Sequence, residues 1–156
     1  MTLLKILFII VFIITGMFAF TLYRNDANLF DAPGFSARLN VYLSGNSAET
    51  ADDHVFEELR TPVFKTSAEQ LYKRTILAAT ALGWQVFAHD SDNQSAHFIV
   101  YSPMFLFKDD VKIQVEFIDM EKSSLSVRSK SQMGRLDLGA NAGHIRDLLT
   151  KLREIQ

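Results

Sequence analysis

The chain has 156 residues, of which 22% are charged, and its formal net charge is −2 at pH 7. It contains no cysteine, which excludes disulfides, zinc–thiolate sites, iron–sulfur clusters and thiol catalysis. The small net charge gives no global attraction to nucleic acid, so we expect no nucleic-acid partner.

The first predicted element is a membrane-spanning helix at the N-terminus. The stretch Ile6–Tyr23 carries no charged residue and is bounded by Lys5 and Arg24. A hydrocarbon core about 30 Å thick needs about 17–25 helical residues, and this stretch meets the lower limit. We therefore predict a transmembrane anchor over residues 1–24, which ties the chain to a membrane through Ile6–Tyr23.

A cleaved signal peptide is the main alternative to this anchor, and a buried helix is the other. Signal peptides have an apolar core of about 7–15 residues and a small-residue cleavage site. Here the apolar core is longer, and the best cleavage candidate, Met17-Phe18-Ala19, has Met where a small residue is needed. The positive-inside rule keeps Lys5 and the N-terminus in the cytoplasm. We predict a single-pass protein of the bacterial inner membrane with its domain in the periplasm.

Residues 25–54 are predicted to connect the anchor to a domain at residues 55–156. The connection contains the turn formers Pro33-Gly34 and Gly45-Asn46-Ser47. Between them, the pattern from Phe35 to Leu43 fits either a short helix or a strand that packs on the domain.

The domain is predicted to begin with a strand over Leu59–Phe64, followed by a helix. The helix begins near Thr66 or Ser67, because both have the spacing of a capping box, and Gly83 ends it. One stripe of this helix is apolar, which predicts that it packs on a sheet.

Four strands and a final helix complete the predicted domain. Their ranges are Trp84–His89, Ala96–Ser102, Val111–Ile118, Leu125–Ser131 and, for the helix, about Ala142–Ile155. Strands joined by short turns are antiparallel, and two helices with one apolar stripe each can cover one sheet face. We predict an α+β fold, a two-layer domain with an antiparallel sheet of about five strands and two helices on one face, preceded by one transmembrane helix. The layout is compatible with helix-grip-like or TATA-binding-protein-like domains by analogy.

Two segments carry a distinctive pattern. One is Phe107-Lys108-Asp109-Asp110-Val111, and the other runs from Val127 to Ile145, into the start of the closing helix. Together they resemble the domain-of-unknown-function family 1499 (DUF1499) over Ser36 to Ile155. The resemblance implies the family's fold and a membrane or envelope association, and it brings no established activity. It makes the following motif residues the candidates for binding: Asp109, Asp110, Arg128, Ser129, Ser131, Gly134, Asp137, Gly139 and Asn141.

Two positions depart from the family pattern. Gln132 and His144 stand where the family usually has arginine. These departures weaken any interpretation that needs a cluster of arginines around an anion.

Arg128 has two interpretations. A hairpin around residues 121–123 places Arg128 opposite Glu116, and we predict a cross-strand ion pair between them, which contributes about 0.2–1 kcal/mol. The alternative is that Arg128, Lys130 and Arg135 grip a phosphate or carboxylate, which arginine can bind bidentately.

The paired aspartates and the glycines are predicted to have structural roles. Asp109 and Asp110 are adjacent in a strand, so their side chains point to opposite faces and do not readily bind one ion. We expect one of them to pair with a basic residue or to accept backbone N–H groups. We expect no metal and no cofactor. Gly134 and Gly139 are predicted in turns, with Asn141 capping the last helix.

The charges are distributed unevenly along the chain. Acidic residues predominate from Arg24 to Leu59 and basic residues from Lys122 to Arg153. We predict that these two segments pack near each other. The alternative is a basic face turned toward anionic lipid or an acidic partner.

No catalytic motif is recognisable, so an enzyme is not expected. The leading hypothesis is a non-catalytic binding or assembly module that faces the periplasm, with another envelope protein as its partner. One alternative is a carrier of lipid or a small apolar ligand, held between sheet and helices beside Met104, Phe105 and Leu106. A second alternative is a hydrolase or anion-processing enzyme, with its site near Arg128, Arg135, Asp137 and Asn141.

Overall fold

The computed structural model describes residues 2–101, 107–136 and 138–155. The elements in chain order are α1 (Thr2–Arg24), α2 (Phe35–Ser44), β1 (Ser47–Glu49), the 3-10 helix η1 (Glu57–Leu59), β2 (Val63–Phe64), α3 (Ala68–Ala81), β3 (Gln85–Asp90), β4 (Ser95–Tyr101), β5 (Lys108–Asp119), β6 (Lys122–Ser131) and α4 (Ala140–Glu154).

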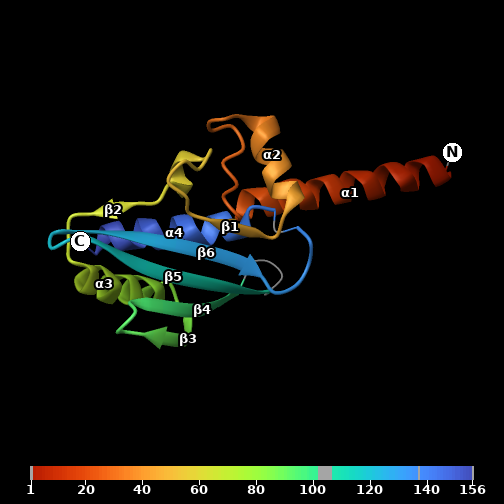
Figure 1. The fold of residues 1–156 in the computed structure, drawn as a ribbon. Coiled ribbons are helices and arrows are strands. Elements are labelled where there is room, and N and C mark those ends of the chain that lie inside the picture. Colours follow the sequence, from red (N-terminus) through yellow and green to blue (C-terminus); the bar gives the residue numbers. More distant parts are fainter. Residues whose placement is uncertain (1, 102–106, 137, 156) are drawn as a thin grey trace.

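A six-stranded antiparallel sheet forms one layer, and α3 and α4 form the other (Figure 1). The strand order is β1-β6-β5-β4-β3, and β2 pairs with the same strand as β1, namely β6. The predicted α+β class, the two layers and the antiparallel sheet are confirmed.

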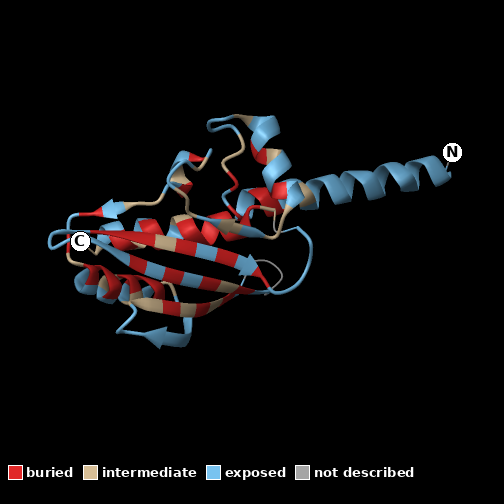
Figure 2. Ribbon diagram, viewed as in Figure 1, coloured by how far each residue is buried: buried red, intermediate tan, exposed pale blue. Residues whose placement is uncertain are grey.

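Helix α1 projects away from the rest of the protein and is exposed along most of its length (Figure 2). It has 23 residues, and the mean hydropathy of its most apolar window is 2.7, with 0% of that window buried. Among the described residues it is the one helix long and apolar enough to cross a membrane. Membrane anchors and signal sequences both have this length and composition. The buried-helix alternative is wrong, because no other element covers this window.

The core lies between the sheet and the two helices. Side chains alternate along β5 and β6, so that Val111, Ile113 and Val115 face inward with Leu125 and Val127 (Figure 2). Full burial of a side chain of this size stabilises the fold by about 1.5–3 kcal/mol. The period-two pattern of the sequence therefore assigned the correct face of both strands to the core.

The start of α3 follows the second of the two predicted capping arrangements. Ser67 is the N-cap, and its hydroxyl accepts a hydrogen bond from the backbone N–H of Gln70 at 3.4 Å. The Gln70 side chain turns to the neighbouring Thr66, whose hydroxyl donates to Oε1 at 2.8 Å. Both predicted capping residues thus contact Gln70, one through the backbone and one through the side chain.

The first predicted strand, Leu59–Phe64, is wrong over most of its length. Leu59 ends the 3-10 helix η1, and only Val63 and Phe64 pair with β6. Pro62 has no N–H to donate to a sheet ladder, although its carbonyl accepts from the N–H of Leu125 at 3.2 Å. The segment Leu59–Phe64 therefore pairs with the sheet only through its last two residues.

The predicted connection contributes both a helix and a strand. The pattern from Phe35 to Leu43 forms α2, which confirms the helical alternative, and α2 buries Arg38 and Tyr42. Strand β1 pairs with the end of β6, with Ala48 opposite Ser129. Most of this segment therefore belongs to the folded structure.

The register of the β5–β6 hairpin differs from the prediction. The turn is tighter, with Asp119 opposite Lys122, so Arg128 lies opposite Lys112 and Glu116 lies opposite Ser124. The predicted ion pair between Glu116 and Arg128 is wrong for this reason. Arg128 instead contacts Glu49 on β1, with Nε and Oε2 3.6 Å apart.

Candidate functional site

Five polar side chains of the inner sheet face and α4 form a buried polar cluster. Asp109 comes from β5, Ser129 and Ser131 come from β6, and Asn141 and His144 come from the first turns of α4. Each residue exposes 7% of its surface or less. Four of the five are motif residues that the sequence singled out, and His144 is one of the two departures. The fold thus gathers the inward-facing part of the motif in one place.

Asn141 is the centre of this cluster. Its Oδ1 accepts a hydrogen bond from the Ser129 hydroxyl at 2.6 Å, and its Nδ2 donates to Ser131 Oγ at 3.0 Å and to the Asn46 carbonyl at 2.9 Å. One amide therefore joins α4 to β6 and to the residue that precedes β1. The predicted capping role is wrong, because Gly139 is the N-cap of α4. The Asn141 side-chain amide, which was predicted to cap the helix, instead hydrogen-bonds to residues of β6 and to Asn46.

Asp109 and His144 form a buried pair at the edge of the cluster. Asp109 Oδ2 lies 2.9 Å from His144 Nε2, and Asp109 Oδ1 has no hydrogen-bond partner among the described residues. The ring of Trp84 meets the His144 ring edge-on, with centroids 6.1 Å apart. A buried carboxylate is costly unless it is paired, so His144 supplies the contact that allows Asp109 to lie inside.

The cluster contains the residue types of a Ser-His-Asp triad, but its geometry differs from one. In a triad the serine hydroxyl contacts the histidine that accepts its proton. Within the described ranges, the hydroxyl of Ser129 donates to Asn141 and that of Ser131 accepts from the same side chain. The arrangement therefore suits the attachment of α4 to the sheet better than nucleophilic attack.

The outer sheet face carries the remaining polar motif residues. Asp110 points away from Asp109, as strand geometry predicts. Its Oδ1 lies 2.7 Å from His97 Nε2 and accepts a hydrogen bond from Gln132 at 3.1 Å. Both aspartates thus contact a histidine, one on each face of the sheet. Because Gln132 stands where the family usually has arginine, the donor to Asp110 at this position is neutral.

Arg128 lies on the outer face and Asn141 under the inner face, so the structure does not bring these two candidate residues together. The Arg128 side chain is 60% exposed and lines an open hollow of about 460 Å³ with Glu49, Lys112 and Gln114. Asp137 and the segment Met104–Leu106 lie outside the described residues. In the ranges that are described, no group of three or more histidine, aspartate or glutamate side chains is placed to hold a metal ion.

The two motif glycines with a turn assignment have the backbone conformation that glycine favours. Gly134 has φ of 88° and Gly139 has φ of 87°. The Gly134 carbonyl accepts from Asn46 Nδ2 at 2.8 Å. A Cβ at Gly139 would lie 3.3 Å from the Ala27 Cβ, so this glycine also lets the segment that follows α1 approach the start of α4 closely.

A second polar cluster, which the sequence analysis missed, lies where α1, α2, η1 and α4 meet; we call it the junction cluster and define it as Arg38, Glu58 and Arg146. Arg38 is 1% exposed. It donates to both carboxylate oxygens of Glu58, at 2.6 and 3.0 Å. Arg146 Nη2 donates to the Asn25 carbonyl at 3.0 Å, and its Nη1 lies 4.0 Å from Glu58.

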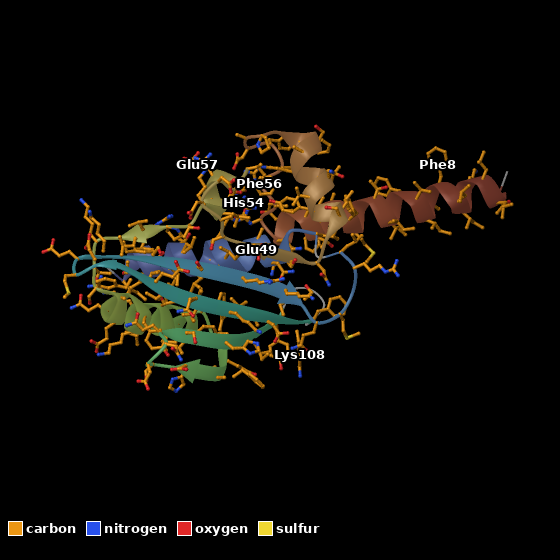
Figure 3. All side chains as sticks on the ribbon, viewed as in Figure 1. Phe8, Glu49, His54, Phe56, Glu57 and Lys108 are labelled. Carbon is orange, nitrogen blue, oxygen red and sulfur yellow. The ribbon has the colours of Figure 1, made fainter. Side chains whose placement is uncertain are left out.

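Aromatic residues surround this junction cluster. The Arg38 guanidinium carbon lies 4.3 Å from the ring centroid of Phe56, and Tyr42 and His54 meet the same ring edge-on. Figure 3 shows His54 and Phe56 beside each other in the segment that leads into η1. The acidic segment Arg24–Leu59 and the basic segment Lys122–Arg153 pack near each other as predicted, since Arg146 lies near Glu58 and Arg128 lies near Glu49.

The charges of the junction cluster shift the pKa of Glu58. Burial acts to raise this pKa, but the hydrogen bond from Arg38 and the positive charges of Arg38 and Arg146 outweigh it, and the pKa of Glu58 is lowered. A carboxylate with a lowered pKa stabilises the fold above its unfolded pKa of about 4.3. That contribution is lost as the pH falls through the lower pKa of the folded state.

We therefore expect the stability difference between the native protein and Glu58→Gln to depend on pH. The native protein is the more stable at pH 7, and the difference narrows as the pH falls below about 4, where the carboxyl becomes neutral. Urea unfolding at a series of pH values measures this. The matched control is Glu57→Gln, one residue away and exposed (Figure 3), for which we expect a small difference at every pH. A stability difference between the native protein and Glu58→Gln that does not change with pH would contradict the ion-pair assignment.

The fold and its buried polar cluster define an α+β domain preceded by one long apolar helix. The family model described as "Protein of unknown function (DUF1499)" matches residues 36–152. The chain belongs to this family, and the resemblance carried by the two motifs is confirmed. The matched region runs from α2 into α4 and contains the whole buried polar cluster.

Several solved structures match the chain. One of them is a START superfamily protein from Mycobacterium smegmatis, with a TM-score of 0.37 and 14% sequence identity, and the match covers 70% of this chain and 95% of that one. No curated protein matches the chain.

Proposed function

We propose that the protein is a membrane-anchored, non-catalytic binding module of the cell envelope. In this proposal α1 spans the inner membrane, the domain stands in the periplasm, and the partner is another envelope protein. The observation that carries it is a group of exposed apolar side chains at the end of the sheet farthest from α1. We call this group the distal apolar tip: Val63 (60% exposed), Phe117 (64%), Ile118 (47%) and Met120 (83%).

The distal apolar tip lies about the length of one strand from the membrane helix. Strand β6 has 10 residues, which span about 30 Å at about 3.3 Å per residue. It starts at the tip and ends at Ser131, beside Asn141 and the junction with α1 (Figure 1). Exposed apolar side chains gathered at one end of a domain commonly mark a site of protein interaction. An anchored domain with such a surface at its far end is suited to meet a partner away from the membrane.

The buried polar cluster supports a non-catalytic role. Its hydroxyl and amide groups are engaged in joining α4 to the sheet, as the contacts of Asn141 show. The layer between sheet and helices, where the alternative hypothesis placed a carried ligand, contains side chains with no exposed surface: Phe98, Val111, Leu125 and Ile145.

Site-specific crosslinking in intact cells tests the partner. A photoreactive phenylalanine analogue replaces Met120 in one strain and Asp92, in the exposed turn between β3 and β4, in a control strain. We expect one discrete protein adduct from position 120 and none from position 92. The absence of an adduct at position 120 would contradict the proposal.

Membrane topology is tested with single cysteines, because the native chain has none. A membrane-impermeant maleimide should label Met120→Cys in spheroplasts, whereas Thr2→Cys should react only after lysis. Labelling of Thr2→Cys in intact spheroplasts, or mature protein that lacks the first residues, would contradict the anchored orientation.

A further inference from the structure

An apolar hollow lies at the end of the domain that joins α1. It has a volume of about 460 Å³ and is lined mostly by apolar side chains, among them Phe18 and Leu22 of α1, Phe30 and Phe35 before and at the start of α2, and Leu39. We call it the membrane-proximal hollow. It is formed between the last turns of the proposed transmembrane helix and a loop of the domain.

The position of this hollow along α1 places it inside a bilayer. If Lys5 and Arg24 mark the two interfaces, the helix between them is about 28 Å long at about 1.5 Å per residue, close to a hydrocarbon thickness of about 30 Å. Thr15 and Phe18, which line the hollow, precede Arg24 by nine and six residues. They lie about 13 and 9 Å below the level of Arg24. The hollow therefore extends from the headgroup level into the acyl chains.

The loop that forms the outer wall of the hollow is fixed by the junction cluster. The buried Arg38 donates to the Asp31 carbonyl at 3.1 Å and to the Ala32 carbonyl at 2.7 Å. This loop presents Phe30, which is 86% exposed and stacks on Phe35 with ring centroids 5.8 Å apart. Apolar aromatic side chains held out in this way suit burial at the boundary between headgroups and acyl chains.

We propose that the membrane-proximal hollow is a lipid site, filled by one acyl chain of a bilayer phospholipid while Phe30 and Phe35 lie at headgroup depth. The occupant follows from continuity, because the inner wall of the hollow is the same helix surface that the bilayer surrounds. This inference rests on the proposed membrane anchor. It differs from the predicted lipid carrier, whose ligand was placed between sheet and helices.

Depth-dependent quenching tests the placement. Full-length single-cysteine variants Phe30→Cys, Phe8→Cys and Met120→Cys carry a fluorophore and are reconstituted in phosphatidylcholine vesicles that contain doxyl-labelled lipid. Phe8 lies on the part of α1 that no other element covers (Figure 3), and Met120 is on the distal apolar tip. We expect strong quenching at positions 8 and 30 and none at position 120.

The three positions separate the lipid site from the anchor. Quenching at position 8 without quenching at position 30 would overturn the lipid site and leave the anchor intact. Absence of quenching at position 8 would overturn the anchor, and the lipid site with it.

Occupancy by an acyl chain is measured with a phospholipid that carries a photoreactive diazirine on its chain. We expect crosslinks to peptides that contain Phe18 and to peptides that contain Phe35 and Leu39. Ala19→Trp fills the hollow from α1 and should reduce the crosslinks to α2 severalfold. Ile9 is exposed on α1 and does not line the hollow, so Ile9→Trp should leave the crosslinks to α2 unchanged. Equal crosslinking of α2 in both variants would overturn occupancy of the hollow.

Discussion

Replacement of Arg38 by alanine is expected to lower the free energy of unfolding by about 3–5 kcal/mol, the range measured when one partner of a buried ion pair is removed. The change leaves Glu58 without its bidentate partner and deprives the Ala32 carbonyl of a donor. It also opens a cavity beside Phe56, whose ring the guanidinium covers. Urea unfolding monitored by circular dichroism measures the loss.

Arg128→Ala is the matched control for this prediction. Arg128 also faces a glutamate, Glu49, but both side chains are largely exposed and the closest atoms are 3.6 Å apart. Exposed pairs of this kind contribute about 0–1 kcal/mol. If the two arginine variants lost similar stability, the junction cluster would not hold the fold together as the contacts indicate.

Replacement of Asn141 by alanine is the second large effect that we expect. The variant removes three hydrogen bonds inside the protein and leaves Ser129, Ser131 and the Asn46 carbonyl without this partner. An unsatisfied buried polar group costs about 1–3 kcal/mol, so we expect a total loss of about 3–4 kcal/mol. Because alanine favours helices more than asparagine does, the loss measures the tertiary contacts and not the helix.

Asn40→Ala provides the control for Asn141. Asn40 is an exposed asparagine within α2, and substitutions at such positions usually change stability by less than about 0.5 kcal/mol. A double-mutant cycle with Ser129→Ala should show a coupling of about 0.5–3 kcal/mol with Asn141→Ala, as contacting residues do. Additive losses would contradict the assignment of a shared hydrogen bond.

The sequence predicted the parts of the fold that depend on local periodicity. Alternation along Val111–Ile118 and the apolar stripe of the last helix identified β5, β6 and α4 together with the faces that they bury. The ends of these elements were predicted less accurately. Strand β5 begins at Lys108 and not at Val111, and α4 begins at Ala140 and not at Ala142. Alternation alone does not locate the ends of β5, whose first and last residues are polar.

The register of the hairpin could not be predicted from the same pattern. A shift by an even number of residues keeps every side chain on its face, so the alternation of β5 and β6 is equally consistent with Arg128 opposite Glu116 or opposite Lys112. The turn between Asp119 and Lys122 decides between them. The sequence offered no glycine at this turn to reveal its position.

The two polar clusters were predicted to different degrees. Four residues of the buried polar cluster were candidates because they belong to the family motif, although Asn141 was expected to serve as a cap. The junction cluster had only a weak local signal, namely the spacing of Arg38 and Tyr42 at i and i+4 on one helix. Its charged contacts join segments far apart in the chain, as Arg146 and Asn25 do, and local pattern does not reveal such partners.

The residue that follows α1 is attached closely to α4, and this limits how far the domain can move relative to that helix. Arg146 and Gly143 both lie against the Asn25 carbonyl, and the Asn25 amide donates to the Leu138 carbonyl at 3.1 Å. Residues 25–34, which follow α1, therefore do not form a loose linker between this helix and the domain. If α1 spans a membrane as proposed, the domain is held at a fixed distance from the lipid surface, and a partner has to reach it at that distance.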